Sequence, residues 1–284
     1  MREKQVCSIG NLKGGVGKTT LSLLLARYLS LKGYDVLVID ADPQGSATQH
    51  LLSEELVDED GMIAKGIHVL LDLMLRSGGA MDDSVIEAQL HHVVPKNSPD
   101  EAYWIFPNFL TASYYDSYLT ANGLHLTLIK KILRALDSYS FDVVIIDCPP
   151  YVNAFTTSAL VVSRHLVIPV EATPISVVSA RLMLETSARY MRDGLIPSDA
   201  LEQVIIVSTK VRRTTASSLA YKQILHYYGD YAAHSYLPFT DTANKFYAGT
   251  LSVSRLLQDT SRVARKIKAL LEELEKKITE VQGE

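Results

Sequence analysis

The chain has 284 residues, 47% of them hydrophobic and 21% charged, which is ample for one large domain with a real core. Its net charge of −4 at pH 7 points to neither nucleic acid nor membrane, and its two cysteines, Cys7 and Cys148, are too few for a disulfide framework. Since no apolar run reaches the ~20 residues of a membrane span and the N-terminus leaves no room for a signal peptide, we expect a cytoplasmic protein.

The first forty residues are typical of a β–α–β unit. A short apolar run, Val6 to Ile9, ends in a glycine-rich turn. The residues from Thr19 to Leu31 then carry apolar side chains at helical spacing, and Gly33 follows where a helix would end. Val36 to Ile39 is the second buried strand. We expect the two strands to be parallel and the crossover between them to be right-handed.

Further apolar runs predict more strands, and helical patterns separate several of them. Because the strands are almost continuously apolar, we expect one α/β domain over residues 1–284, with a mostly parallel, twisted sheet and helices on both faces. The acidic stretch 54–60, in the weakly patterned residues 53–100, is interpreted as a solvated loop. The later predicted strands are 104–106, Val143 to Ile146, Leu166 to Val170 and Val204 to Val207, and the predicted helices are Leu119 to Leu136, Val177 to Met191, Leu219 to Tyr228 and about Gln258 to Val281.

The turn after the first strand, Lys13-Gly14-Gly15-Val16-Gly17-Lys18-Thr19-Thr20, carries the clearest chemistry. Glycines let backbone N–H groups converge on a phosphate, and the following helix N-terminus adds partial positive charge. Lys18 is placed to reach the β- and γ-phosphates of ATP, and the Thr19 hydroxyl to hold Mg²⁺. The strict pattern G-x-x-x-x-G-K-[ST] is not met, because its first position is Leu12. We interpret the turn as a variant P-loop.

Two carboxylates follow predicted strands. Asp42 belongs to the segment Asp40-Ala41-Asp42-Pro43-Gln44-Gly45, and Asp147 precedes Cys148-Pro149-Pro150. Carboxylates at the carboxyl ends of parallel strands point into the ligand crevice of an open sheet. We therefore expect Asp147 to act near Mg²⁺ as a Walker-B-type carboxylate, and Asp42 to position Mg²⁺ or the attacking water. Asp40 is interpreted as a carboxylate that caps the turn.

The three motifs resemble those of the ParA/MinD family. Lys13 to Thr19 looks like the deviant Walker A motif of that family, Asp40 to Gly45 like the switch I segment of its ParA branch, and Asp147 to Pro150 like the Walker B end of that branch. The resemblance covers residues 5 to about 260. It implies an ATP-sandwich homodimer in which Lys13 reaches the nucleotide of the other subunit, and so adds Lys13 to the catalytic set of Lys18, Asp42 and Asp147.

The same resemblance implies weak ATP hydrolysis that a ParB-like partner stimulates, and ATP-dependent DNA binding without sequence preference. The resemblance also implies that the protein associates with the nucleoid and segregates a plasmid or a chromosome. Some plasmid ParA proteins carry a helix-turn-helix domain before the P-loop; none stands there in this sequence, so we expect no operator-specific repression. Relatives often have a basic residue after the proline near adenine, whereas Pro238 is followed by Phe239. By position, Thr209 and Pro238 are the predicted adenine contacts.

Positive charge is concentrated late in the chain. Residues 203–268 contain ten basic and three acidic residues, a net charge of +7 in a chain of net charge −4. Such asymmetry is typical of a phosphate-binding surface, unless the basic side chains stand on separate solvated helix faces. The predicted DNA contacts are Arg181, Lys210, Arg212, Arg213, Lys222, Arg255, Arg262 and Arg265.

Two other functions stay open at this point. A MinD-like membrane-positioning ATPase needs a terminal amphipathic helix with bulky apolar anchors, and the tail Glu272 to Glu284 has no aromatic residue. A metabolic P-loop enzyme would be an ATP-dependent amide-forming synthetase or a cluster-binding reductase, and a cluster needs cysteine ligands besides Cys148. ATP-dependent binding to plasmid DNA, to lipid vesicles or to neither distinguishes the three functions. We expect DNA and no membrane.

Overall fold

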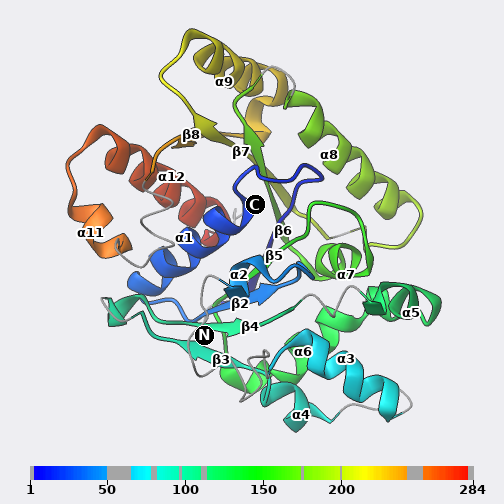
Figure 1. The fold of residues 1–284 in the computed structure, drawn as a ribbon. Coiled ribbons are helices and arrows are strands. Elements are labelled where there is room, and N and C mark those ends of the chain that lie inside the picture. Colours follow the sequence, from blue (N-terminus) through cyan, green and yellow to red (C-terminus); the bar gives the residue numbers. More distant parts are fainter. Residues whose placement is uncertain are drawn as a thin grey trace.

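An eight-stranded sheet lies at the centre of the computed structural model, between two layers of helices (Figure 1). All neighbouring strands are parallel except the first two in sheet order, which are antiparallel. The structure describes residues 3–49, 65–77, 82–95, 98–109, 114–173, 176–198, 200–241 and 252–280. In sheet order the strands are β3 (His91–Val93), β4 (Tyr103–Phe106), β2 (Val36–Asp40), β5 (Val143–Asp147), β1 (Gln5–Ile9), β6 (His165–Glu171), β7 (Gln203–Val211) and β8 (Ala232–Pro238).

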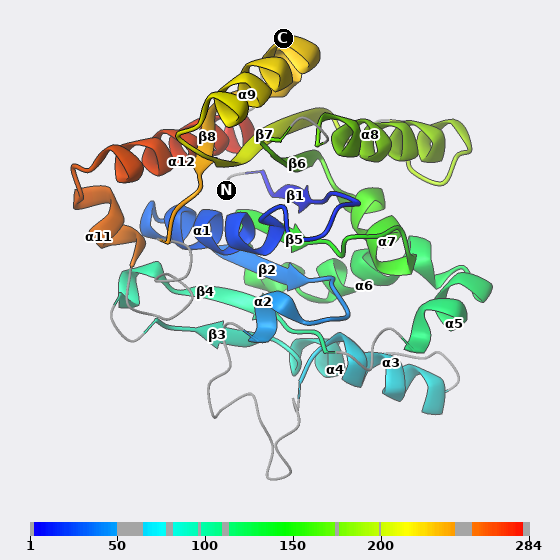
Figure 2. The ribbon, with the colours of Figure 1, turned by 45° about the horizontal axis from the view of Figure 1, so that its top comes forward.

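Helices cover both faces of this sheet (Figure 2). One face packs against α1 (Lys18–Leu31), α11 (Val253–Gln258) and α12 (Arg262–Thr279), and α2 (Ser46–Gln49) is a single turn after β2. The predicted class, a mostly parallel α/β sheet with helices on both faces, is therefore confirmed. The opposite face packs against α3 (Ile67–Arg76), α4 (Asp83–Glu87), α5 (Asp116–Ala121), α6 (Leu128–Ala135), α7 (Ala154–Val162), α8 (Val177–Arg192) and α9 (Thr215–Tyr228).

The continuous apolar strands are explained by burial on both faces. In β5, Val143 and Ile145 pack into the cluster around α1 and α12, while Val144 and Ile146 pack into the cluster around α6 and α7. All four side chains are fully buried. A strand in such a place needs apolar residues at successive positions rather than at alternate ones, and their removal from water is the main stabilising contribution. Cys7 and Cys148 are buried thiols within these same layers.

Two strands were not predicted, β3 and β8. β3 has three residues, and β8 places His234 in solvent, so neither presents the apolar run that marks the inner strands. The acidic stretch 54–60, for which we expected a solvated loop, lies outside the described residues.

One of the predicted helices is interrupted and another begins later than predicted, and a local cause is visible in each. The predicted helix Leu119 to Leu136 ends with α5 just before Gly123, whose φ of +68° is left-handed, and α6 begins at Leu128. The predicted helix of about 258–281 corresponds to α12, which begins at Arg262, and the short α11 precedes the predicted range. Ser261 caps α12, because its hydroxyl accepts a hydrogen bond from the Ala264 N–H at 3.2 Å.

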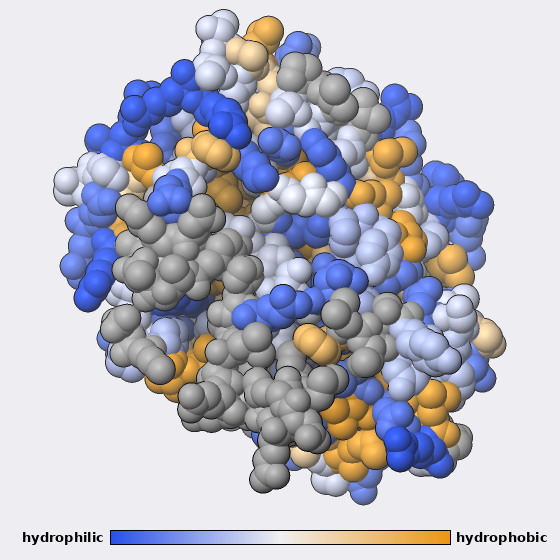
Figure 3. Space-filling model, viewed as in Figure 1, coloured by the Kyte–Doolittle hydropathy of each residue, from blue (hydrophilic) through white to orange (hydrophobic). Residues whose placement is uncertain are grey.

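The surface shown in Figure 3 is mostly hydrophilic, with apolar residues in small separate groups. One such group lies in the region of α3, where Leu73 and Leu75 are exposed. Among the described helices, none is both long and apolar enough to cross a membrane.

Strand register brings the chemically important residues to one edge of the sheet. Asp147, the last residue of β5, pairs with Ile9 of β1 on one side and with Asp40 of β2 on the other. The P-loop leaves β1 at that same edge and enters α1. Carboxyl ends of neighbouring parallel strands meet in this way at the ligand crevice of an open α/β sheet.

Candidate functional site

The P-loop adopts the backbone shape that a phosphate cradle needs. Gly15 has a φ of +70° and Gly17, the N-cap of α1, a φ of +92°, a region that L-residues rarely adopt. A Cβ atom at either position would meet no described protein atom within 4 Å. Both glycines thus border open space at the N-terminus of a 14-residue helix, where backbone N–H groups and the helix dipole favour an anion.

Lys18 and Asp147 are the charged side chains beside this phosphate-binding loop. Lys18 is only 7% exposed, and its Nζ atom donates to the Lys13 carbonyl at 3.4 Å. Burial lowers the pKa of Lys18, and the nearby carboxylates of Asp147 and Asp42 oppose this shift. An ammonium group that lacks water in this way gains from an anionic ligand, because a phosphate replaces the lost hydration.

The Asp147 carboxylate is held by two hydroxyl groups of α1. Thr19 Oγ1 donates to Asp147 Oδ2 at 2.7 Å, and Ser22 Oγ donates to Asp147 Oδ1 at 3.0 Å. Asp147 is fully buried, and this burial raises its pKa to about 6 although both hydrogen bonds lower it. Hard oxygen ligands beside a phosphate cradle, one of them a carboxylate short of positive charge, fit Mg²⁺.

Asp40 and Asp42 have different surroundings, although they stand two residues apart. Asp40 is fully buried; its carboxylate accepts from the Asp42 N–H at 3.2 Å and from the N–H and hydroxyl of Thr48 at 2.8 and 2.7 Å. It therefore ties the turn after β2 to α2, as predicted. Asp42 accepts from the Gln44 N–H at 2.9 Å, and its charge acts on Lys18 and Asp147.

Lys13 is held within its own chain. Its Nζ atom lies 3.0 Å from Ser176 Oγ and 3.3 Å from Glu171 Oε2, at the end of β6. The Lys13 N–H donates to Asn11 Oδ1 at 3.0 Å. No pattern in the sequence indicated this contact, because Glu171 and Ser176 are about 160 residues away and belong to no motif.

The two predicted adenine contacts lie in different places. Thr209 is fully buried on β7, and its hydroxyl donates to the Val16 carbonyl at 2.7 Å, so it supports the P-loop. Pro238, at the end of β8, lines a small hollow of about 60 Å³ together with Thr20, Leu24, Phe239 and other residues. We call this the apolar hollow. Thr20 is the last residue of the P-loop motif, so the hollow borders the cradle.

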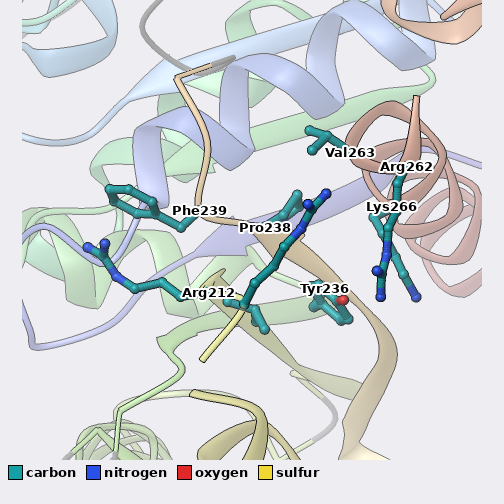
Figure 4. Close-up of a pocket in the computed structure, with 9 residues that line it drawn as sticks. Arg212, Tyr236, Pro238, Phe239, Arg262, Val263 and Lys266 are labelled. Atoms are coloured by element: carbon teal, nitrogen blue, oxygen red, sulfur yellow. The ribbon is translucent and has the colours of Figure 1, made fainter. Parts of the chain in front are cut away.

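Three of the predicted DNA contacts meet in one place. Arg212, Arg213 and Arg262 line a hollow of about 190 Å³, which we call the cationic hollow, with Lys266 as a fourth cation. Figure 4 shows Arg262 and Lys266 on α12 at one side, and Arg212 beside Phe239 at the other. None of the lining residues is acidic. In the described part of the chain, no carboxylate forms an ion pair with these four cations.

The other five predicted contacts are not among the residues that line the cationic hollow. Arg181 on α8 forms an ion pair with Glu185 one turn later, at 2.7 Å. Lys210 lines the apolar hollow instead. Lys222, Arg255 and Arg265 lie on α9, α11 and α12. Tyr236, Phe239 and Lys266 also line the cationic hollow, and strand β8, which was not predicted, brings the two aromatic rings there.

The chain is similar in sequence to a known protein family and to known proteins. A family model described as an AAA domain matches residues 4–193, which is more than half of the chain. The chain is 28% identical to the chromosome-partitioning ATPase Soj of Treponema pallidum over 229 residues, which are 80% of each protein. The residues matched by the family model include the P-loop, Asp42 and Asp147, and so the whole cradle.

Solved structures share the fold. A complex of Cyanothece McdA with ATP aligns over the whole of both chains with a TM-score of 0.77 and 20% identity. Cobyrinic acid a,c-diamide synthase from Mycobacterium smegmatis, with bound ATP analog and magnesium, aligns with a TM-score of 0.74 and 23% identity over 96% of this chain and 95% of the synthase. At these identities the likeness shows the fold alone, and the fold serves proteins of different function.

Proposed function

The chain belongs to the ParA-type branch of the AAA-domain family, and from this premise we propose that it is an ATP-dependent partitioning ATPase that works as a homodimer on DNA. The observation that carries the proposal is a P-loop with two lysines, Lys13 and Lys18, beside the Asp147 carboxylate. The similarity to the chromosome-partitioning relative supports a chromosome as the cargo, and the resemblance of the motifs adds a plasmid as the other cargo.

The proposed reaction is in-line attack of water on the γ-phosphate of ATP. Residues Gly14 to Thr20 would hold the phosphates, with Lys18 neutralising the charge that develops on the transferred group. Thr19, Asp147 and Asp42 would hold Mg²⁺ or position the water. Bound Mg²⁺ would supply positive charge that polarises the phosphate oxygens. Pro238 would contact the base in the apolar hollow, and Thr209 would act by supporting the loop.

DNA binding would use the cationic hollow. Four cations within one concave surface without acidic lining residues attract a phosphate backbone, and contacts to phosphates carry no base sequence information. Arg181, Lys210, Lys222, Arg255 and Arg265 would extend the contact if the dimer presents them beside the hollow. A ParB-like protein would stimulate hydrolysis, and the dimer would reside on the nucleoid in the cytoplasm.

One experiment separates this function from the two alternatives. The purified protein is incubated with Mg²⁺ and a slowly hydrolysed ATP analogue, then with plasmid DNA or with anionic lipid vesicles, and sedimented. We expect binding to DNA that needs the nucleotide and no binding to vesicles. Vesicle binding would instead indicate a membrane-positioning ATPase. Binding to neither would favour a metabolic enzyme, for which the fold alone is equally suitable.

A further inference from the structure

The cationic and apolar hollows are neighbours with a common wall. Pro238 and Phe239, at the end of β8, line both of them. Phe239 is 50% exposed, which makes it the most exposed side chain around the apolar hollow. A group that enters this small hollow presses against its walls, and the half-exposed ring is the wall with the least packing to hold it in place.

The other side of the Phe239 ring carries one of the four cations. The guanidinium carbon of Arg212 lies 3.5 Å from the ring centroid, in a cation–π contact that Figure 4 displays. The position of Arg212 in the cationic hollow therefore depends on the position of the ring. Lys266 has a similar contact with Tyr236, at 4.9 Å, but Tyr236 lines only the cationic hollow.

A backbone hydrogen bond also connects the linings of the two hollows near Phe239. The Phe239 N–H donates to the Val211 carbonyl at 2.9 Å, which ties the end of β8 to the residue before Arg212. Lys210, one residue earlier, lines the apolar hollow and has a φ of +52°, an uncommon value for a residue other than glycine. The pairing of β7 with β8 shifts register at this point. Lys210 and Val211, two successive residues of β7, thus line different hollows.

From these contacts we propose that Phe239 couples the two hollows within one subunit. The base of a nucleotide, bound in the apolar hollow with its phosphates on the P-loop, fixes the ring and with it Arg212, and so raises the affinity of the cationic hollow for phosphate. The inference rests on the proposed function, from which it takes the nucleotide and the DNA. It adds a second route by which ATP controls DNA binding, besides the formation of the dimer. By linkage, DNA raises the affinity for the nucleotide by the same factor.

The test compares Phe239→Leu, which keeps an apolar wall without a π face, with Phe239→Tyr, which keeps the face. Leu219→Ala, at an exposed apolar position on α9, is the matched control. A fluorescent DNA duplex is titrated with each protein, without ligand, with a slowly hydrolysed ATP analogue, and with tripolyphosphate, which has no base. Light scattering on the same samples measures the dimer.

For Phe239→Leu we expect normal dimerisation with the analogue, but a gain in DNA affinity about two- to five-fold smaller than in the wild type, the range of a partly exposed cation–π contact. Phe239→Tyr and Leu219→Ala should keep the wild-type gain. In the wild type, tripolyphosphate should raise DNA affinity less than the analogue does. In Phe239→Leu, tripolyphosphate and the analogue should raise DNA affinity equally.

Three results would overturn the coupling. The first is a full nucleotide-dependent gain in Phe239→Leu, which would leave the proposed function intact. The second is a Phe239→Leu protein that no longer dimerises, because the residue would then act through the dimer and not within one subunit. The third is a wild-type protein whose DNA affinity does not change when the analogue is added, and this result would contradict the proposed function as well.

Discussion

Lys13 of the P-loop forms an ion pair with Glu171 at the end of β6, with 3.3 Å between Nζ and Oε2. Both side chains are partly exposed, and Ser176 completes the contact at 3.0 Å from the same Nζ atom. If Lys13 serves the partner subunit in the dimer, this contact belongs to the monomer and must break. The ion pair then stabilises the monomer against the dimer.

Glu171→Gln should therefore make dimerisation easier. A partly exposed ion pair contributes roughly 0.2–1 kcal/mol, so the ATP concentration that gives half-maximal dimer should fall by up to about five-fold. Light scattering during an ATP titration measures this concentration. Glu185→Gln, which breaks an exposed pair with Arg181 on α8, should leave it unchanged. A requirement for more ATP in Glu171→Gln would show that Glu171 supports the dimer instead.

The buried Asp147 carboxylate should make the nucleotide-free protein less stable as pH rises from about 4 to 6. Its pKa in the folded protein is about 6, above the value of ~3.9 for an unfolded chain. Within this window the folded state still holds a proton that the unfolded state has released, so the free energy of unfolding falls as pH rises and levels off above it. Asp147→Asn should remove the fall and raise stability at pH 7.5 by up to about 3 kcal/mol.

Urea unfolding at several pH values, without nucleotide or Mg²⁺, measures this effect. The difference between the variant and the wild type reports Asp147 together with its effect on Asp40, whose pKa is raised by burial and by the Asp147 charge. Asp230→Asn, in an exposed turn, should follow the wild type at every pH. An Asp147→Asn protein whose advantage is as large at pH 4 as at pH 7.5 would contradict the assigned cause.

Glu101 should be essential for the stability of the α11 region. It is fully buried, forms an ion pair with Arg27 of α1, and accepts hydrogen bonds from the N–H groups of Val253 and Ser254 at 3.1 and 2.7 Å. These are N–H groups of the first turn of α11, which have no partner within the helix. Glu101→Gln removes the carboxylate charge from this buried ion pair, so we expect a loss of roughly 3 kcal/mol.

Thermal and urea unfolding should both report this loss. Glu272→Gln, whose exposed pair with Lys268 spans 3.8 Å, is the control and should change stability by less than about 0.5 kcal/mol. A Glu101→Gln protein as stable as this control would mean that the Arg27 charge finds other compensation.

The double variant Arg212→Ala, Arg213→Ala should weaken DNA binding equally for unrelated sequences. Each lost phosphate contact lowers the slope of log affinity against log salt by about 0.9, so the slope should fall by nearly 2. Fluorescence anisotropy at several salt concentrations, with two DNA sequences, gives both values. Lys130→Ala, Lys131→Ala on α6 removes as much charge from the other face of the sheet and should have little effect. An unchanged slope in the arginine variant would exclude the cationic hollow as the contact.

The sequence was sufficient where a feature is local or repeats along the chain. The P-loop, Asp147 and the inner strands were predicted because a glycine-rich turn and an apolar run each occupy neighbouring positions. The turn-holding role of Asp40 was also predicted, since its partners Asp42 and Thr48 lie within eight residues. Such local patterns do not predict contacts between segments that are distant in the sequence. Glu171 contacts Lys13, and Glu101 contacts α11, because the order of the strands in the sheet brings these segments together.

Removal of Lys13 should act in the opposite direction to removal of Glu171, and this contrast tests the cross-subunit role most directly. Lys18 already serves the cradle from the start of α1, so the P-loop does not need Lys13 to bind ATP within one subunit. Two ATP molecules that face each other across a dimer repel one another, and a lysine from each subunit would offset that repulsion. Lys13→Ala should thus still bind ATP as a monomer but lose the ATP-dependent dimer, DNA binding and most hydrolysis. A fluorescent ATP analogue measures binding, and light scattering with a slowly hydrolysed analogue measures the dimer. Lys276→Ala, an exposed lysine of α12, should behave as the wild type. If Lys13 only formed the pair with Glu171, Lys13→Ala and Glu171→Gln would change the dimer in the same direction.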